Sequence, residues 1–255
     1  MIKQLMRIDA RGLTDIGQVR NSNQDTYLID GNTRLYIVAD GMGGHAGGEV
    51  ASSMCVEIVS GYVVDRIRQL GKDKIIGTSI DGHVFEILRT AVNLASTKIY
   101  ERALEEPKLS GMGTTVSLLL FINSKAYIAH VGDSRVYLVR SRFIYQLTND
   151  HSLANEYQQR HGKESHSGED KAVASNIITR SVGCQEEEDV DTHVVGVEVG
   201  DMYVLSSDGL HGMISDAEIS LCVSKERLKA VESLVDLANE RDGKDNITIV
   251  VVAAK

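Results

Sequence analysis

The chain has 255 residues, of which 42% are hydrophobic and 25% are charged, as in an ordinary globular protein with a well-buried core. Its formal net charge of −9 argues against nucleic acids and anionic membranes as partners, because both bind basic surfaces. The first residues lack the apolar run of a signal peptide, and no stretch of sequence reaches transmembrane length. We therefore expect one cytoplasmic domain over residues 1–255, acting as a monomer.

The cysteine and histidine content argues against a zinc site. Cys55, Cys184 and Cys222 are odd in number and lack metal-ligand spacing, so we interpret each as a small buried apolar residue in a reducing compartment. The eight histidines form no zinc-binding motif. Pro107 is the single proline, and no low-complexity linker divides the chain, which supports one domain.

A hairpin is predicted near the N-terminus. The polar segment 20–25 precedes a strand-like run over 26–29, a turn, and an apolar run over 35–39. Pairing of these two runs would bring Asp25 close to Asp40. Taken alone, the polar segment would be a solvated loop.

The apolar run ends at Asp40, and a glycine-rich segment follows. Its glycines are Gly41, Gly43, Gly44, Gly47 and Gly48. Such glycines let the backbone approach a phosphate or a metal ion closely. A dinucleotide-binding turn is one alternative, because Gly41, Gly43 and Ala46 fit its G-x-G-x-x-G/A spacing. Asp40 argues against it, since a carboxylate at the strand end would face the bound anion. A plain strand-to-helix turn is the other alternative.

Two amphipathic helices are predicted next. Apolar residues recur at helical spacing over 49–70 and again over 83–106, with Pro107 beyond the second end. Both apolar faces are most simply faces of the core, and neither indicates a cofactor site.

Strands dominate the middle of the chain. The runs 116–122, 126–131 and 136–139 have strand length with no helical segment between them, which predicts an antiparallel meander. Asp133 follows a glycine between the last two runs, in a segment that is an ordinary hairpin turn in most proteins.

The polar and aperiodic segment 148–176 predicts a short helix with a mobile surface flap. A segment of this type forms a lid or binds a partner. The acidic run 186–189 is interpreted as a solvated turn.

The C-terminal part alternates strands and a helix. The expected elements are strands over 194–199, 202–206 and 247–253 and a helix over 228–238. Asp208 follows the second of these strands, and Asp245 precedes the last one.

Four aspartates share one local context, a strand edge with a glycine adjacent or within two residues. They are Asp40, Asp133, Asp208 and Asp245. Carboxylate and carbonyl oxygens are the ligands of hard cations such as Mg²⁺ and Mn²⁺. Burying several carboxylates together without a cation is costly unless some of them are protonated. We therefore predict that they share a metal site.

The ordered motifs resemble those of the metal-dependent protein serine/threonine phosphatases of the PPM, or type 2C, family in its compact bacterial form. The matching motifs are Arg20 to Asp25, Asp40-Gly41-Met42-Gly43-Gly44, Gly113-Thr114-Thr115, Gly132-Asp133-Ser134-Arg135, Ser207-Asp208-Gly209 and Asp245-Asn246. Each motif is weak alone, but six in order from about Gly12 to Val252 are specific. The resemblance implies an α/β sandwich, in which two antiparallel β-sheets pack face to face and α-helices flank them.

The resemblance also implies the roles of the aspartates. In the family pattern Asp40 bridges two metal ions, the Gly41 carbonyl completes one site, and Asp208 and Asp245 hold the other ion. We therefore expect two Mn²⁺ or Mg²⁺ ions to activate a water that attacks the phosphorus of phosphorylated protein substrates.

Further positions match the family pattern outside this core. Asp25 matches an acidic position that contacts the metals through water, and Asp133 with Asp208 matches a third, weaker metal site. Arg20 matches the phosphate-binding arginine, whose planar fork holds two oxygens at once.

One position departs from the eukaryotic pattern. Many eukaryotic members carry a histidine where this chain has Met42, as the proposed acid for the leaving group. His45 could replace it, but a lone histidine in a glycine-rich turn is more often structural, so a metal-bound water is favoured as the acid. A competing function is a catalytically silent PPM-like binding module, which would lack a metal ligand or Arg20. A nucleotide-binding protein is the third hypothesis.

Overall fold

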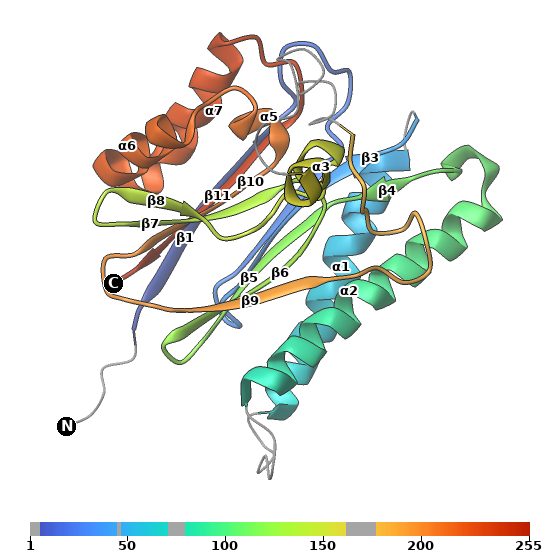
Figure 1. The fold of residues 1–255 in the computed structure, drawn as a ribbon, viewed down its shortest axis with the longest axis horizontal. Helices are drawn as coiled ribbons and strands as arrows, with labels where there is room; N and C mark the ends of the chain where they lie inside the picture. The colour runs from blue at the N-terminus through green and yellow to red at the C-terminus, as the bar shows by residue number, and fades with distance from the viewer. Residues whose placement is uncertain (1–5, 45–46, 71–79, 162–176) are drawn as a thin grey trace.

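The computed structural model describes residues 6–44, 47–161 without 71–79, and 177–255. In these residues two antiparallel β-sheets pack face to face, and helices cover both outer faces (Figure 1). The expected α/β sandwich is therefore confirmed.

The first sheet has five strands in the order β1-β11-β10-β7-β8. They are β1 Ile8–Asp15, β11 Ile247–Ala254, β10 Met202–Ser206, β7 Arg135–Arg140 and β8 Phe143–Gln146. Both chain ends thus lie in one sheet, because β1 pairs with β11 from Ile8↔Ala254 to Asp15↔Ile247.

The second sheet has the strand order β2-β3-β5-β6-β9, and a short β4 pairs with β3 off this path. The strands are β2 Asp25–Asp30, β3 Leu35–Met42, β4 Gly113–Thr114, β5 Val116–Ile122, β6 Lys125–Val131 and β9 Asp191–Gly196. The predicted hairpin is present as β2 and β3, with Asp25 opposite Asp40.

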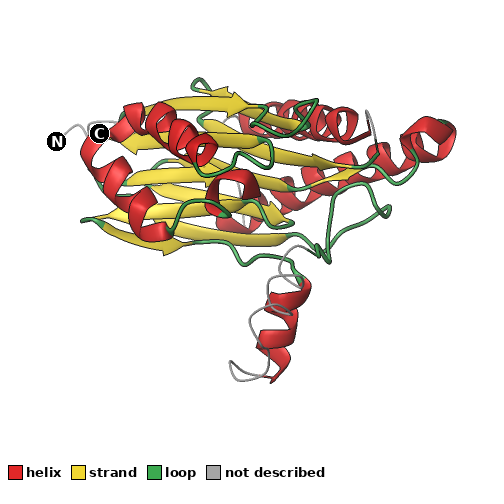
Figure 2. Cartoon of the chain, turned by 90° about the horizontal axis from the view of Figure 1, so that it is seen from above, coloured by secondary structure: helices red, strands yellow, loops and turns green. Residues whose placement is uncertain are grey.

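Long helices cover the second sheet and short ones the first (Figure 1). The helices are α1 Gly47–Leu70, α2 Ile80–Glu105, α3 Leu153–His161, α5 Asp208–His211, α6 Asp216–Glu226 and α7 Ala230–Glu240, with short 3₁₀ turns at Pro107–Leu109 and Arg227–Lys229. None of the helices in the described ranges combines the length and apolarity needed to cross a membrane. The helix α3 protrudes from the sandwich (Figure 2).

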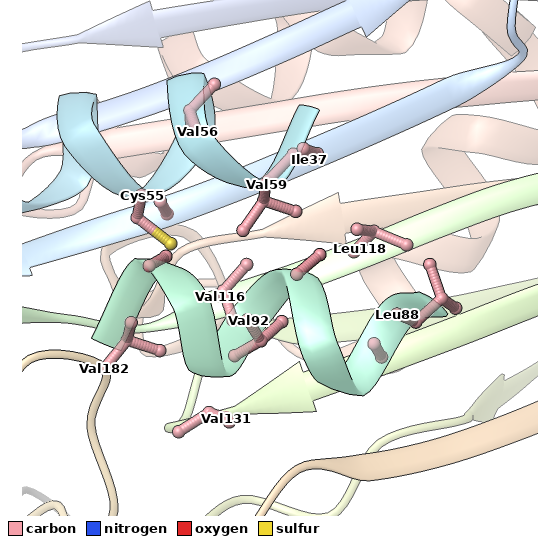
Figure 3. Packing of buried hydrophobic residues seen from close by; sticks show 14 of the residues in the cluster. Ile37, Cys55, Val56, Val59, Leu88, Val92, Val116, Leu118, Val131 and Val182 are labelled. Atoms are coloured by element: carbon pink, nitrogen blue, oxygen red, sulfur yellow. The ribbon is translucent and has the colours of Figure 1, made fainter. Parts of the chain in front are cut away.

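The hydrophobic core has three layers that follow the architecture. One lies between the two sheets, one between the first sheet and α6 and α7, and one between the second sheet and α1 and α2. In the last layer Val59 of α1 and Val92 of α2 point toward the sheet residues Ile37, Val116 and Leu118 (Figure 3). The apolar helix faces are therefore faces of the core, as predicted. Each fully buried valine, leucine or isoleucine side chain contributes about 1.5–3 kcal/mol to the free energy of unfolding.

The predicted meander is only partly present. The strands β5 and β6 pair, but β7 pairs with β10 and β8 in the other sheet. Gly132, with φ +107°, lies where the chain crosses between the sheets. The strand expected over 194–199 is β9 at Asp191–Gly196, and it also lies in a different sheet from the next strand, β10.

Other boundaries also differ from the sequence predictions. The strand β3 does not end at Asp40 but continues to Met42, because β4 offers a further pairing partner at Thr114 and Gly113. The helix α6 was not predicted, although Ser215 and Glu218 form a capping box at its start.

Three surface predictions need correction or restriction. Cys184 is exposed, so only Cys55 is a fully buried thiol, and Cys222 is half-buried. In the acidic run 186–189 the side chain of Glu188 is buried, while the other three residues are exposed. The short helix expected within 148–176 is α3, and residues 162–176 lie outside the described part of the chain, as does His45.

Candidate metal centre

The predicted metal ligands gather at one end of the sandwich, from both sheets. Asp25 and Asp40 face each other in register across β2 and β3 of the second sheet. Asp208 opens the short helix after β10, and Asp245 lies just before β11, so both come from the first sheet. Ser207 joins the two sheets here, because its Oγ donates to Asp25 Oδ2 at 2.8 Å.

Asp133 reaches the same end of the molecule from the crossing between β6 and β7. Its carboxyl group is buried, and its pKa is raised to about 7 by burial first, and then by the charges of Asp208 and Asp150. The five predicted aspartates are therefore brought together.

Burial and mutual repulsion shape the electrostatics of the site. Burial raises the pKa of Asp40 well above its ordinary value, and the charges of the other four aspartates raise it further. Burial also raises the pKa of Asp25 to about 7, against hydrogen bonds from Thr248 and Ser207. The pKa of Asp208 is raised by burial and by Asp245, while a side-chain hydrogen bond with Asp40 opposes the rise.

Buried oxygen atoms without a partner test whether this donor set fits a cation. Among the described residues, Oδ1 of Asp25, Asp133 and Asp208 is buried and accepts no hydrogen bond. An unsatisfied buried acceptor costs about 1–3 kcal/mol, and more when it is charged. A divalent cation would both satisfy these oxygens and offset the repulsion, so the residues fit a hard metal ion.

The aspartate side chains are not arranged as a complete set of metal ligands. Within the described ranges, no group of three or more His, Cys, Asp or Glu side chains is placed so that it could hold a metal ion by itself. Mg²⁺ and related ions keep several waters, so a few protein oxygens completed by water are a suitable set.

The backbone at Gly41 is held against the start of α1. Its N–H donates to the Gln24 carbonyl at 3.2 Å, and a Cβ at this position would collide with the carbonyl oxygens of Gly48 and Gln24. Only glycine fits here, which explains why the residue after Asp40 has no side chain.

Threonines that sequence analysis matched only as a motif hold Asp40 in place. Thr115 donates its N–H to the Asp40 carbonyl at 2.8 Å, and its Oγ1 accepts the Asp40 N–H at 2.9 Å. Thr114 Oγ1 also donates to the Asp40 carbonyl, at 2.9 Å. The motif Gly113-Thr114-Thr115 was the sequence signal for this positioning role.

Asn246 holds the N-terminal loop that carries Arg20. Its Nδ2 donates to the carbonyls of Ile16 and Ser22 at 2.9 Å each, and its Oδ1 accepts the Gln24 N–H at 2.8 Å. The polar segment 20–25 is thus tied to the start of β11 and is not a free solvated loop.

Arg20 lies at the rim of the site. Its Nη2 donates to Asp245 Oδ2 at 2.6 Å, and half of its side chain is exposed. The remaining N–H groups of the guanidinium are available to an anion that approaches from solvent.

The comparisons with known proteins agree with this geometry. A sequence model described as Protein phosphatase 2C matches residues 17–245. The chain belongs to the protein phosphatase 2C family. Protein phosphatase PhpP of Streptococcus pneumoniae is 38% identical to this PP2C chain over 248 residues, which cover 94% of this chain and 95% of that one.

Solved structures support the family assignment of this PP2C chain. The serine/threonine phosphatase of S. agalactiae superposes with a TM-score of 0.82 at 33% identity, covering 97% of this chain and 100% of that one. The catalytic domain of serine threonine protein phosphatase PstP, in complex with 2 manganese ions, gives a TM-score of 0.78 at 30% identity over 98% and 99% of the two chains.

This PP2C chain is therefore a protein serine/threonine phosphatase that depends on divalent metal ions. The relatives give no support to a catalytically silent binding module.

Proposed function

We propose that two Mn²⁺ or Mg²⁺ ions bind this phosphatase through Asp40, the Gly41 carbonyl, Asp208 and Asp245, and that Asp133 with Asp208 binds a third ion. The buried oxygens without hydrogen-bond partners support this assignment, because three of the five aspartates have one. When bound, the ions act as Lewis acids that activate water and offset the charge of the phosphoryl group.

The other carboxylate, Asp25, is proposed to act on ordered water next to the ions. Its Oδ2 accepts the hydrogen bond from Ser207, so Oδ1 alone remains unpartnered among its oxygens. A fixed carboxylate of this kind orients water molecules without a direct metal bond.

Arg20 is proposed to bind the phosphate of the substrate. It is half-exposed and held over the rim by Asp245, and its planar fork can hold two phosphoryl oxygens at once. Met42 carries no exchangeable proton, so the proton for the leaving group comes from water and not from this side chain.

The substrates are proposed to be phosphoserine and phosphothreonine residues of cytoplasmic proteins. The three free thiols, Cys55, Cys184 and Cys222, fit a reducing compartment. The helix α3 protrudes from the sandwich (Figure 2), which supports a contact between this helix and a protein substrate.

Release of inorganic phosphate tests this function. Peptides with phosphoserine, phosphothreonine or phosphotyrosine would be incubated with Mn²⁺, with Mg²⁺, and with excess EDTA. We expect turnover of the first two peptides with either ion and none with EDTA. Full turnover in EDTA would contradict the proposed metal centre.

A further inference from the structure

A second surface feature lies between strand β8 and helix α6, two elements that Figure 1 shows next to each other. This β8–α6 groove has a volume of about 650 Å³. The strand β7 starts two residues after Asp133 and runs six residues to the hairpin at the groove. At about 3.3 Å per residue, the hairpin is roughly 17–20 Å from the metal centre.

The charges of the groove are all positive. Arg142 and Lys225 are its only charged lining residues. Within the described residues, neither side chain has an ion pair or a hydrogen bond. Two unpaired cations on one groove are notable in a chain of net charge −9, and they favour an acidic ligand.

Apolar side chains lie between these cations. Phe143 of β8 and Leu221 of α6 are 67% and 70% exposed, and Ile144 lines the groove beside them. Large apolar side chains at solvent next to unpaired charges are typical of a surface that binds a partner segment.

In the part of the chain that the structure describes, β8 is the last strand of the first sheet, so no strand pairs with its outer backbone edge there. The Leu147 N–H donates to the Val136 carbonyl, so these two residues form a hydrogen-bonded pair. Along β7 and β8 such pairs alternate with pairs whose backbone groups point away from the partner strand. By this alternation the N–H and C=O groups of Ile144 and Gln146 point outward, where an added strand would pair with them.

The hairpin that presents this edge is fixed in place. Its two turn residues, Ser141 and Arg142, both have positive φ, 53° and 70°, at a cost of about 1–2 kcal/mol each for non-glycine residues. Ser220 of α6 donates its Oγ hydrogen bond to the Arg142 carbonyl at 2.8 Å. The groove is therefore preformed, which lowers the entropic cost of binding.

We propose that the β8–α6 groove binds an extended acidic segment of a partner protein, which adds a strand to β8. In this arrangement every second side chain of the segment faces the groove, and these groove-facing positions include apolar side chains that pack on Phe143 and Leu221. Its carboxylates pair with Arg142 and Lys225. The main-chain hydrogen bonds provide affinity, and the charges select acidic sequences.

Fluorescence anisotropy with a labelled nonapeptide of the repeat Glu-Glu-Val-Val, which presents both residue types on each face of a strand, tests this proposal on the full chain. We expect saturable binding that weakens as NaCl rises, because the charge pairs are exposed to solvent. A lysine and valine peptide, and a glutamate and valine peptide with a central proline, should bind much more weakly. Equal binding of all three peptides would overturn the proposal.

Charge reversal identifies the surface that binds. Arg142→Glu and Lys225→Glu should each weaken the peptide affinity about fivefold or more. The exposed Lys229, which does not line the groove, provides the matched control Lys229→Glu with little effect. All three variants should hydrolyse para-nitrophenyl phosphate at the wild-type rate. Unchanged affinity in both groove variants would overturn the proposal.

A second copy of this chain is the rival occupant. Light scattering after size exclusion would be measured on the wild type and on Leu221→Ser. A wild-type dimer that this substitution dissociates would overturn the proposal in favour of a homodimer interface, and a monomer in both cases supports it.

Discussion

The surroundings of Asp40 are unfavourable for an ionised carboxyl group. Four other carboxyl groups act on it, and its pKa is raised well above its ordinary value by burial and by their charges. Placing a carboxylate among four others does not stabilise the metal-free fold. This placement supports the proposed role of Asp40 in metal binding.

Substitution of Asp40 should lower the catalytic rate without lowering the melting temperature. Asp40→Asn should lower turnover of para-nitrophenyl phosphate by about a hundredfold or more, because a proposed bridging charge is lost. The metal-free variant should melt at the wild-type temperature or above it, since a carboxyl group that its four neighbours repel is removed. Asp236→Asn on the exposed face of α7 is the control and should change neither quantity. A near-normal rate in Asp40→Asn would mean that another carboxylate bridges the ions.

Arg20 should act on the substrate more than on the metal. Its ion pair with Asp245 is half-exposed, so its loss should cost at most about 1 kcal/mol of stability. Arg20→Ala should raise KM with metal affinity nearly unchanged, and Arg20→Lys should restore binding only in part, because lysine lacks the fork. Steady-state kinetics beside calorimetric metal titration would measure both. A variant whose main defect is lost metal binding would refute the role in phosphate binding.

At the scale of elements, hydrogen bonds tie the segment 148–152, the start of the predicted flap, to the sandwich. Arg135 binds Asp150 through two nitrogens, and Gly132 donates its N–H to His151 Nδ1 at 3.1 Å. These bonds join the base of the flap to the crossing that carries Asp133. A segment to be exchanged without breaking these bonds therefore starts at Leu153.

Exchange of this segment should affect the activity on phosphoproteins and not the activity on a small substrate. Replacing 153–176 by a short glycine and serine linker should lower turnover of phosphoproteins and spare para-nitrophenyl phosphate, because no proposed ligand is removed. Asp150→Ala is the matched comparison and should lower both, since it frees Arg135 beside Asp133. The two rates would be measured for each protein. Equal losses in the exchange variant would reject this division.

His130 makes one strand of the second sheet sensitive to pH. Its ring is buried and lies 3.1 Å from Ser117 Oγ, and burial lowers its pKa from 6.5 to about 4. Between these values the unfolded chain takes up a proton that the folded chain does not. The stability from this group is therefore lost as the pH falls from 6.5 to about 4.

Thermal melts from pH 4 to 8 would measure this effect. His130→Gln should reduce the loss of stability between pH 6.5 and 4, by up to about 1.4 kcal/mol for each pH unit. His193→Gln, at an exposed position, should retain the wild-type slope. An unchanged slope in His130→Gln would show that the ring does not titrate with unfolding.

For the whole molecule, metal binding and protonation should compete. Asp25 and Asp133 have pKa values raised from 3.8 to about 7, so in the metal-free fold they contribute stability below pH 3.8 that is lost as the pH rises through about 7. Bound cations would favour the ionised forms instead. The gain in stability on adding Mn²⁺ should therefore be larger at pH 8 than at pH 6.

Calorimetry in buffers with different ionisation enthalpies would measure the protons released on Mn²⁺ binding. We expect release at pH 6 and much less at pH 8. Binding at pH 6 without proton release would contradict the assignment of these two carboxyl groups to the metal centre.

The sequence by itself determined the family-level fold, the two long helices and the identity of the acidic residues. The helical spacing of apolar residues and the pairing of an aspartate with a glycine at a strand edge are both patterns of residues that are near in sequence. They can therefore be recognised without the tertiary structure. The hairpin that pairs Asp25 with Asp40 was also predictable, because its turn is short.

Only the tertiary structure decided which sheet each strand joins. A run of apolar residues gives the same pattern in either sheet, so the crossing at Gly132 and the place of β9 could not be read from 126–139 or 194–199. The exposure of Cys184, the buried Glu188 and the hydrogen bonds of Asn246 likewise depend on segments distant in sequence. Burial and long-range hydrogen bonds arise only when the two sheets pack together, and this packing also brings the five aspartates to one end of the molecule.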